Sequence, residues 1–347
     1  MNQEQQLIYN ELISKYKFNH SQKEIIKFGL EDSLNVKVFA KPEFLANQMN
    51  EIRVGLKNNL DVSIYANPEF NKLQMGEIRL GLENKIDVSV YAKPELDWQQ
   101  MHEIRIGLER GVDVSIYKEF HPYQMTEIRK GLVNNVDVSL YAKHEYSWQQ
   151  MEEIRKGLNY KLDVSIYINP EFNHTQMREI RYGLASGVDV TIYAKPEFDS
   201  SQMGQIRLGL QNNIDISIYS NPELNYAKMQ EIRFALEKGT NPVEISKYAI
   251  PIYSIAQMYE LFRGLERDLD VTYYANPEFG PYQMAEIRFG LENNVDVSLY
   301  ANFEFNGAQM TQIRLGLEAG LDVTPYLNPN IDWKEMEQIR RKIKRNK

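Results

Sequence analysis

The sequence predicts an all-α fold: an α-solenoid of about thirteen short helix–turn–helix repeats that form an arc or superhelix. Three observations predict this fold class. Twelve methionines recur at intervals of 26 residues, except for one interval of 24 and one of 29. Most of these methionines follow a helix-capping pattern. They are also followed by apolar residues at the spacing of one helix face.

One well-formed copy shows the whole repeat. Residues 74–82 read Gln-Met-Gly-Glu-Ile-Arg-Leu-Gly-Leu, residues 87–92 read Asp-Val-Ser-Val-Tyr-Ala and residues 94–96 read Pro-Glu-Leu. A degenerate first copy carries Lys23 in place of the methionine. We therefore expect a capping helix over residues 1–18, a repeat array over residues 19–333 that continues into the last helix, and a basic C-terminal cap over residues 334–347.

The first helix of each repeat has a predictable beginning. Asn, Asp or Ser stands four residues before most of the methionines, as at Asn71 and Asp97, and Gln follows three residues later, as at Gln74. This pattern predicts a capping box, in which side chains satisfy the free backbone N–H groups of the first turn. Pro122 and Pro281 fall one residue after the cap, where proline is favoured.

The body of this helix has an apolar stripe and a recurrent glycine. The methionine, the isoleucine three residues later and the leucine seven residues later share one face. A glycine returns six residues after the methionine, as at Gly81, although glycine costs about 1 kcal/mol of helix propensity relative to alanine. We expect the backbone of a neighbouring helix to approach closely there.

The second element of the repeat is the Asp-Val-Ser-x-Tyr-Ala segment. Asp61, Asp87 and Asp113 can cap a short helix that turns valine, tyrosine and alanine inward. A β-strand remains an alternative, because Leu60 and Val62 alternate with polar residues, and a strand plus a helix would give a horseshoe. The aspartate caps favour two helices.

These motifs also carry a resemblance. Gln-Met-x-Glu-Ile-Arg-x-Gly-Leu followed by Asp-Val-Ser-x-Tyr-Ala-x-Pro-Glu-Phe resembles tandem repeats in poorly characterised proteins of Gram-positive bacteria, their phages and mobile elements. The resemblance covers nearly the whole chain. It implies a helical repeat fold and a host–parasite setting, and it implies no specific activity.

An arginine recurs four residues after the methionine and predicts a structural ladder. A partly buried arginine needs an acidic partner, and we expect either the aspartate of the second element or the glutamate of Pro-Glu-Phe. A ladder that binds phosphates is the alternative. In the Met258 copy Phe262 takes the arginine position, so one rung is altered. The predicted ladder comprises Arg53, Arg79, Arg105, Arg129, Arg155, Arg181, Arg207, Arg233, Arg288 and Arg314.

The composition excludes several classes of catalytic and metal site. The chain has no cysteine, which excludes thiolate metal sites and cysteine nucleophiles, and its five histidines form no metal-ligand motif. The glutamate two residues after each methionine recurs too often to be one member of a catalytic pair. We therefore expect no enzyme activity, no catalytic residue, no metal site and no cofactor.

Functional residues are expected where the repeat pattern breaks. Large aromatic side chains stand near several helix N-termini, where we expect partial exposure, and they are candidate anchors for a partner. The alternative is packing against the adjacent loop. These candidates are Trp98, Trp148, Trp333, Tyr123, Tyr226 and Tyr282.

The sequence as a whole favours a non-catalytic scaffold that binds a protein, such as a phage or mobile-element factor that sequesters a host protein. Nucleic acid is a less favoured partner, because the formal net charge is −8, and an acidic DNA mimic is a second rival. No apolar run is long enough to span a membrane, so we expect no membrane partner and a cytoplasmic location.

Overall fold

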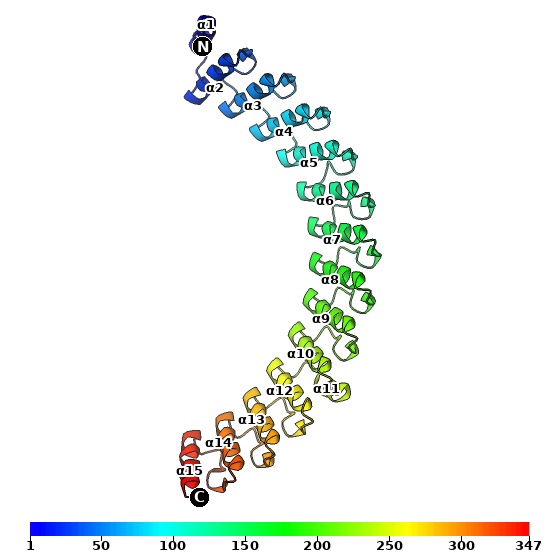
Figure 1. Cartoon of the computed structure of the whole chain (residues 1–347), viewed down its shortest axis with the longest axis vertical. Helices are drawn as coiled ribbons and strands as arrows, with labels where there is room; N and C mark the ends of the chain where they lie inside the picture. The colour runs from blue at the N-terminus through cyan, green and yellow to red at the C-terminus, as the bar shows by residue number, and fades with distance from the viewer. Residues whose placement is uncertain (347) are drawn as a thin grey trace. The chain divides into compact units, whose positions relative to one another are not determined.

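The structure, a computed structural model, describes residues 1–346 and is helical without a β-strand over that range. The expected helical repeat array is therefore confirmed, and the horseshoe alternative is wrong. The chain divides into two compact units, Met1–Val164 and Ser165–Lys347, which are described separately below. Figure 1 shows each unit as a series of repeats, and the predicted C-terminal cap includes residue 347, which lies outside the described residues.

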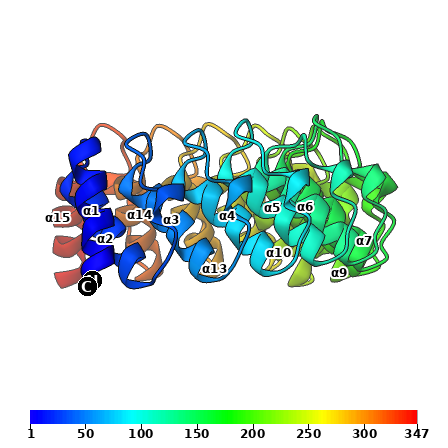
Figure 2. The ribbon, with the colours of Figure 1, turned by 90° about the horizontal axis from the view of Figure 1, so that it is seen from above.

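Unit 1 contains seven α-helices that follow one another in chain order (Figure 2). They are α1 (Gln3–Lys15), α2 (His20–Glu31), α3 (Ala46–Lys57), α4 (Lys72–Glu83), α5 (Trp98–Glu109), α6 (Pro122–Val133) and α7 (Trp148–Asn159). Between them lie the short helices η1 (Val36–Val38), η2 (Val62–Ile64), η3 (Val88–Val90), η4 (Val114–Ile116) and η5 (Val138–Leu140), and η6 (Val164–Ile166) follows α7. From α1 to α6, each α-helix packs on the next one in sequence.

Unit 2 continues the same alternation. Its α-helices are α8 (His174–Ala185), α9 (Ser200–Gln211), α10 (Tyr226–Glu237), α11 (Pro242–Tyr248), α12 (Ile255–Leu265), α13 (Pro281–Glu292), α14 (Gly307–Glu318) and α15 (Trp333–Arg345). Its short helices are η7 (Val190–Ile192), η8 (Ile216–Ile218), η9 (Val271–Tyr273), η10 (Val297–Leu299) and η11 (Thr324–Tyr326). The extra residues of the 29-residue repeat lie at α11, which replaces a short helix.

The predicted caps define where the long helices begin. At the start of α4 the Asn71 side chain accepts the backbone N–H groups of Leu73 and Gln74, and the Gln74 side chain accepts the N–H of Asn71. The same glutamine donates to the carbonyl oxygens of Pro94 and Leu96, at 3.1 and 2.6 Å. One residue therefore caps its own helix and also holds the loop that leads to the next.

A left-handed residue ends most of the long helices. Lys85 (φ 57°) and Gly111 (φ 71°) occupy this position after α4 and α5. In each case the following N–H group returns to a carbonyl in the last turn, as from Ile86 to Gly81 at 2.8 Å. This closure satisfies the free carbonyl groups of the helix end and turns the chain toward the second element.

The second element is shorter than a full α-helix. Each copy from η1 to η11 is a single turn of 3₁₀ helix, three residues long. Asp87 caps η3 by accepting the backbone N–H and the hydroxyl of Ser89, at 3.1 and 2.6 Å. The aspartate caps were predicted, but the segment between cap and proline holds too few residues for further turns.

The recurrent glycine makes room for a tyrosine of the same repeat, and the expected neighbouring backbone is wrong. A Cβ atom on Gly81 would lie 1.9 Å from the Tyr91 hydroxyl and 2.8 Å from a methyl of Val88. The Tyr91 ring is fully buried, and its hydroxyl donates to the carbonyl oxygen of Glu77 at 3.1 Å. In the α10 repeat Ile245 replaces the tyrosine, and there the glycine position holds Ala235.

Candidate functional site

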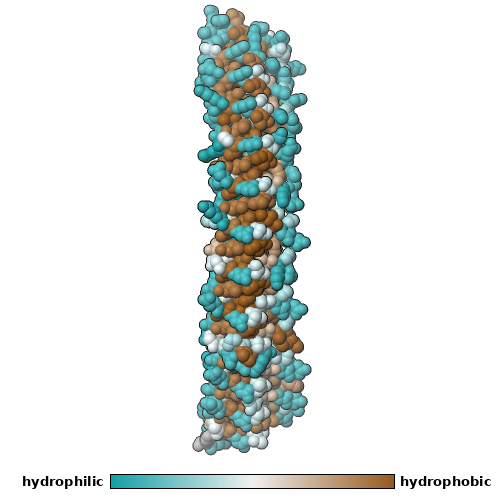
Figure 3. All heavy atoms as spheres, turned by 90° about the vertical axis from the view of Figure 1, so that its right-hand side faces the viewer, coloured by the Kyte–Doolittle hydropathy of each residue, from teal (hydrophilic) through white to brown (hydrophobic). Residues whose placement is uncertain are grey.

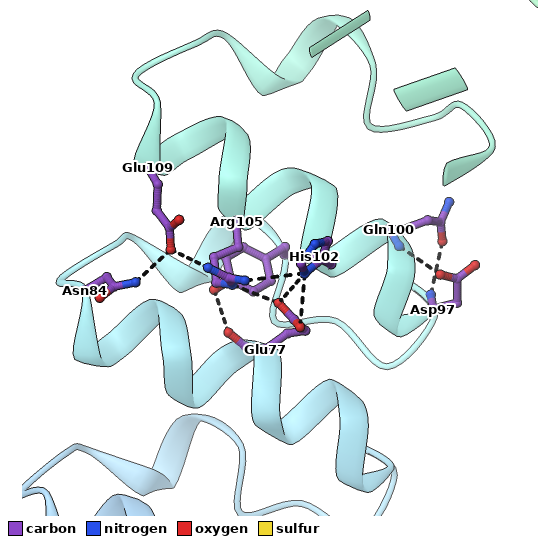
Figure 4. A network of polar contacts seen from close by, with 8 residues as sticks. Glu77, Asn84, Asp97, Gln100, His102, Arg105 and Glu109 are labelled. Carbon is purple, nitrogen blue, oxygen red and sulfur yellow. Dashed lines mark hydrogen bonds and ion pairs between the residues drawn. The ribbon is translucent and has the colours of Figure 1, made fainter. Parts of the chain in front are cut away.

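The arginine ladder joins each long helix to the one before it. Arg105 of α5 donates through Nε to Glu77 of α4 at 2.8 Å and through Nη1 to Glu109 of its own helix (Figure 4). Glu109 also accepts the side-chain amide of Asn84 at 2.8 Å. One guanidinium thus connects two carboxylates on two neighbouring helices, and we refer to such a connection as a rung.

The acid in these rungs is not the one expected. The aspartate of the second element caps its short helix instead, and the arginine pairs with the residue two positions after the methionine of the preceding repeat. This residue is a glutamate or a glutamine, so its recurrence is explained by the ladder. The pairs are Arg79 with Glu51, Arg129 with Glu103, Arg155 with Glu127, Arg207 with Glu179, Arg233 with Gln205, Arg288 with Glu260 and Arg314 with Glu286.

One position of the predicted ladder differs in detail. Arg53, at the N-terminal end, pairs with Asp32 at 2.6 Å, because the first copy has no glutamate at the equivalent place. Arg181 lies with its guanidinium over the ring of Tyr182, 4.6 Å from the centroid, as Arg233 and Arg288 lie over the rings that follow them.

Ion pairs raise the pKa of Arg79, Arg105, Arg288 and Arg314 in spite of their burial. Burial by itself would lower the pKa of Arg105, but hydrogen bonds and charges from Glu77 and Glu109 outweigh it and raise that pKa. The same balance of burial and ion pairing raises the pKa of Arg288 and of Arg314. The guanidinium groups are already paired within the chain, which leaves them poorly placed to hold a phosphate ligand.

The aromatic candidates of unit 1 include one cluster. Tyr123 of α6 and Trp148 of α7 lie with ring centroids 5.7 Å apart, and the His121 ring lies 5.5 Å from Tyr123. Tyr123 is 55% exposed and Trp148 is 38% exposed. We refer to His121, Tyr123 and Trp148 as the aromatic cluster. Trp98 is 37% exposed near the start of α5 and has no ring contact among the described residues.

The candidates of unit 2 do not gather in one place. Tyr226 is exposed at the start of α10. Tyr282 of α13 packs against Gly307 and shares a 3.1 Å hydrogen bond with Thr311 of α14. Trp333 stands under the Lys334 ammonium at the start of α15. No ring contact joins these three side chains, so unit 2 has no equivalent of the aromatic cluster among its described residues.

Sequence reasoning missed an apolar row on the short helices. From η1 to η8 and in η10 their third residue is apolar and not fully buried, and in unit 1 the row consists of Val38, Ile64, Val90, Ile116 and Leu140. Figure 3 shows apolar side chains collected in a band on one face of the repeats. Because the row recurs in most copies, it does not single out a position for a partner. The alternation of apolar residues in this segment was its visible signal.

His121 was also missed as a member of the site. Sequence reasoning considered the histidines only as metal ligands, whereas His121 contributes a ring to the aromatic cluster and the N-cap of α6. The signal was its place just before Pro122 and Tyr123, where other repeats carry Asn, Asp or Ser.

Comparison of the chain with known family models, curated proteins and solved structures gave no match. Among the described residues, no helix combines the length and the apolar character that crossing a bilayer requires.

Proposed function

We propose that the chain is a non-catalytic scaffold that binds another protein, and that the aromatic cluster is its main contact point. The observation that carries this proposal is the pairing of Tyr123 with Trp148 at exposed positions. Such rings supply large contact areas at little cost in side-chain entropy, and they dominate the energetics of many protein interfaces.

The surrounding repeats support a binding role. The recurrent polar residues are used inside the chain: glutamates and arginines in the rungs, glutamines and aspartates in the caps. What recurs is therefore architecture, and the aromatic cluster is a departure from it. We propose a cytoplasmic protein of the host as the partner, in keeping with the cysteine-free composition and the resemblance to phage and mobile-element repeats.

The proposal is tested by affinity purification of the tagged full chain from cells that encode it. We expect a stoichiometric protein partner that survives nuclease treatment. Tyr123→Ala and Trp148→Ala should each reduce its recovery about tenfold or more, because both rings would be hot spots.

A matched variant controls for the loss of any exposed ring. Tyr160→Ala removes a tyrosine that is 68% exposed at the end of α7, outside the aromatic cluster, and it should leave recovery unchanged. Equal recovery with all three variants would remove the cluster from the interface. Nucleic acid that co-purifies and is released by moderate salt would replace the protein-binding proposal with nucleic-acid binding.

A further inference from the structure

In unit 2 the contact between the neighbouring helices α10 and α12, which we call a joint, lacks its rung. Glu231 of α10 occupies the position that accepts an arginine elsewhere, but the matching position on α12 holds Phe262, which is 2% exposed. The Glu231 carboxylate has no hydrogen bond or ion pair among the described residues. Burial is the largest influence on its pKa and raises it, Lys238 lowers it and Glu266 raises it further. We refer to this joint as the open rung.

A groove opens at this joint. It has a volume of about 420 Å³, within the range of small-ligand pockets. Glu231, Phe234 and Phe262 line it together with Tyr259, Arg263 and Glu266. Its walls are therefore aromatic, and its one carboxylate without an ion pair is Glu231, since Glu266 pairs with Lys238 at 2.8 Å and Glu237 pairs with Arg233.

Intact joints of the same unit show what such a place accepts. At the joint between α13 and α14, Glu286 accepts Nε of Arg314 at 2.8 Å, and the same guanidinium lies over the Phe289 ring, 5.5 Å from its centroid. Tyr182 and Glu179 receive Arg207 in the same way, at 5.7 and 2.9 Å. A carboxylate and an aromatic ring on one helix thus form a receptor for a guanidinium from the next repeat.

The open rung retains this receptor without the guanidinium. Phe234 stands where Phe289 and Tyr182 stand in the other repeats, and Glu231 stands where Glu286 and Glu179 stand. The Phe289 ring lies under the guanidinium of Arg288 from its own helix and under that of Arg314, whereas among the described residues Arg233, 4.6 Å from the ring centroid, is the one cation over Phe234. One side of the receptor is thus unfilled.

The cations already at the groove do not fill it. Lys238 is committed to Glu266, and Arg263 lies over the Tyr259 ring, 5.2 Å from the centroid, with Nη1 on the Tyr259 hydroxyl. The Nε atom of Arg263 is buried without a hydrogen-bond partner, so it does not donate to the Glu231 carboxylate.

We infer that the open rung binds an arginine side chain supplied by a partner protein. The incoming guanidinium would donate to Glu231 and lie on Phe234, as the chain's own arginines do elsewhere. Arginine suits this place better than lysine, because its planar group can stack on a ring and hydrogen-bond a carboxylate at once. The assignment to a protein ligand rests on the proposed function, whereas the receptor can be tested without any partner.

The test uses N-acetyl-arginine methylamide as the probe and the full chain labelled at alanine methyl groups, observed by NMR. Ala235 lines the groove and reports on binding. We expect a saturable shift of the Ala235 methyl signal. N-acetyl-citrulline methylamide, which has the same shape without the charge, should bind at least about tenfold more weakly.

Variants decide whether Glu231 is the acceptor. Glu231→Gln should weaken the response about tenfold, whereas Glu197→Gln, which removes the same charge from an exposed site, should leave it unchanged. Phe262→Arg should abolish it by filling the rung from within. Equal shifts with both probes, or a full response in Glu231→Gln, would overturn the inference. Loss of partner recovery in the Tyr123 and Trp148 variants bears only on the proposed function, so the two can fail separately.

Discussion

Arg155 shows what one rung contributes at the scale of a residue. Its Nε donates to Glu127 at 2.8 Å, and both side chains are nearly buried. A buried carboxylate that loses its partner keeps the cost of its burial. Removal of Arg155 would therefore leave the Glu127 carboxylate buried without this partner. Lys130, 2.6 Å from Glu127, would offset part of that cost.

We predict that Arg155→Ala lowers the free energy of unfolding by about 3 kcal/mol. Lys57→Ala removes an exposed cation that pairs with Asp32 at 2.9 Å, and it should cost less than about 1 kcal/mol. Chemical denaturation followed by circular dichroism measures both. An unchanged midpoint for Arg155→Ala would show that the ladder is not structural.

Gly81 and Gly76 lie in the same helix and predict opposite outcomes. A Cβ atom at Gly81 would meet the Tyr91 hydroxyl at 1.9 Å, whereas at Gly76 the nearest atom is a Glu51 oxygen at 3.9 Å. Gly81→Ala should therefore destabilise by about 2 kcal/mol, through overpacking. Gly76→Ala should stabilise by up to about 1 kcal/mol, through helix propensity.

The pairing of Ala235 with Ile245 supplies the matched rescue. If the tyrosine is what requires the glycine, Tyr91→Ile should reduce the cost of Gly81→Ala when the two are combined. Denaturant melts of the single and double variants give this coupling energy. Additive effects would contradict the explanation.

At the scale of the element, the short helices from η2 onward place a tyrosine beneath a long helix, and after η1 this residue is Phe39. Burial raises the pKa of Tyr91 above its ordinary value of about 10 and raises that of Tyr326 to about 12. The tyrosines at this position whose pKa is raised by burial are Tyr65, Tyr91, Tyr117, Tyr141, Tyr193, Tyr219, Tyr274, Tyr300 and Tyr326. The ionisation of these phenols is therefore linked to unfolding.

We predict a steep alkaline unfolding transition. Below the pKa of an unfolded tyrosine, about 10, the folded and unfolded states both keep their phenolic protons, and the stabilisation is fully present. Above it the unfolded chain releases protons that the folded chain retains, so the free energy of unfolding falls as the pH rises. Tyrosinate absorbance and circular dichroism, recorded together, should show buried tyrosines ionising only as helix is lost. Their full ionisation in a helical chain would contradict the prediction.

The helical elements could be predicted from the sequence because their signals are local. Asn71 and Gln74 predict the start of a helix from within four residues of sequence, and Asp87 predicts the short helix in the same way. The partner of Arg105 could not be predicted, because Glu77 lies 28 residues away and several acids recur at the same period. Periodicity alone leaves the register between neighbouring repeats undetermined.

The candidate site was predictable only in part, for the same reason. The aromatic residues were visible as departures from the pattern, and Phe262 was visible as a missing arginine. The contact between Tyr123 and Trp148 depends on how α6 packs on α7, and the open rung depends on which acid an arginine selects. Both require the packing of neighbouring repeats.

At the scale of the whole molecule, stability is built from neighbour contacts. Within each unit the long helices pack on the next in sequence, so a repeat array should lose stability gradually as copies are removed. Unit 1 comprises residues 1–164 and carries the complete aromatic cluster. Because the helices of unit 1 pack on one another, we expect its stability to come from contacts within the unit.

We predict that a fragment of residues 1–164 folds alone, with helicity per residue close to that of the full chain. It should unfold at a lower denaturant concentration, because it contains fewer interfaces between neighbouring repeats than the full chain. Circular dichroism and urea melts measure both quantities. A fragment without helical signal would show that unit 1 does not fold on its own.

Hydrogen exchange of the purified chain, with and without the protein that co-purifies with it, tests the central claim that partners bind where the repeat pattern breaks. We predict partner-dependent protection at residues 121–123 and at the start of α7, and at the facing parts of α10 and α12. Protection spread evenly over the repeats, or confined to regular copies such as α3 and α4, would contradict the claim.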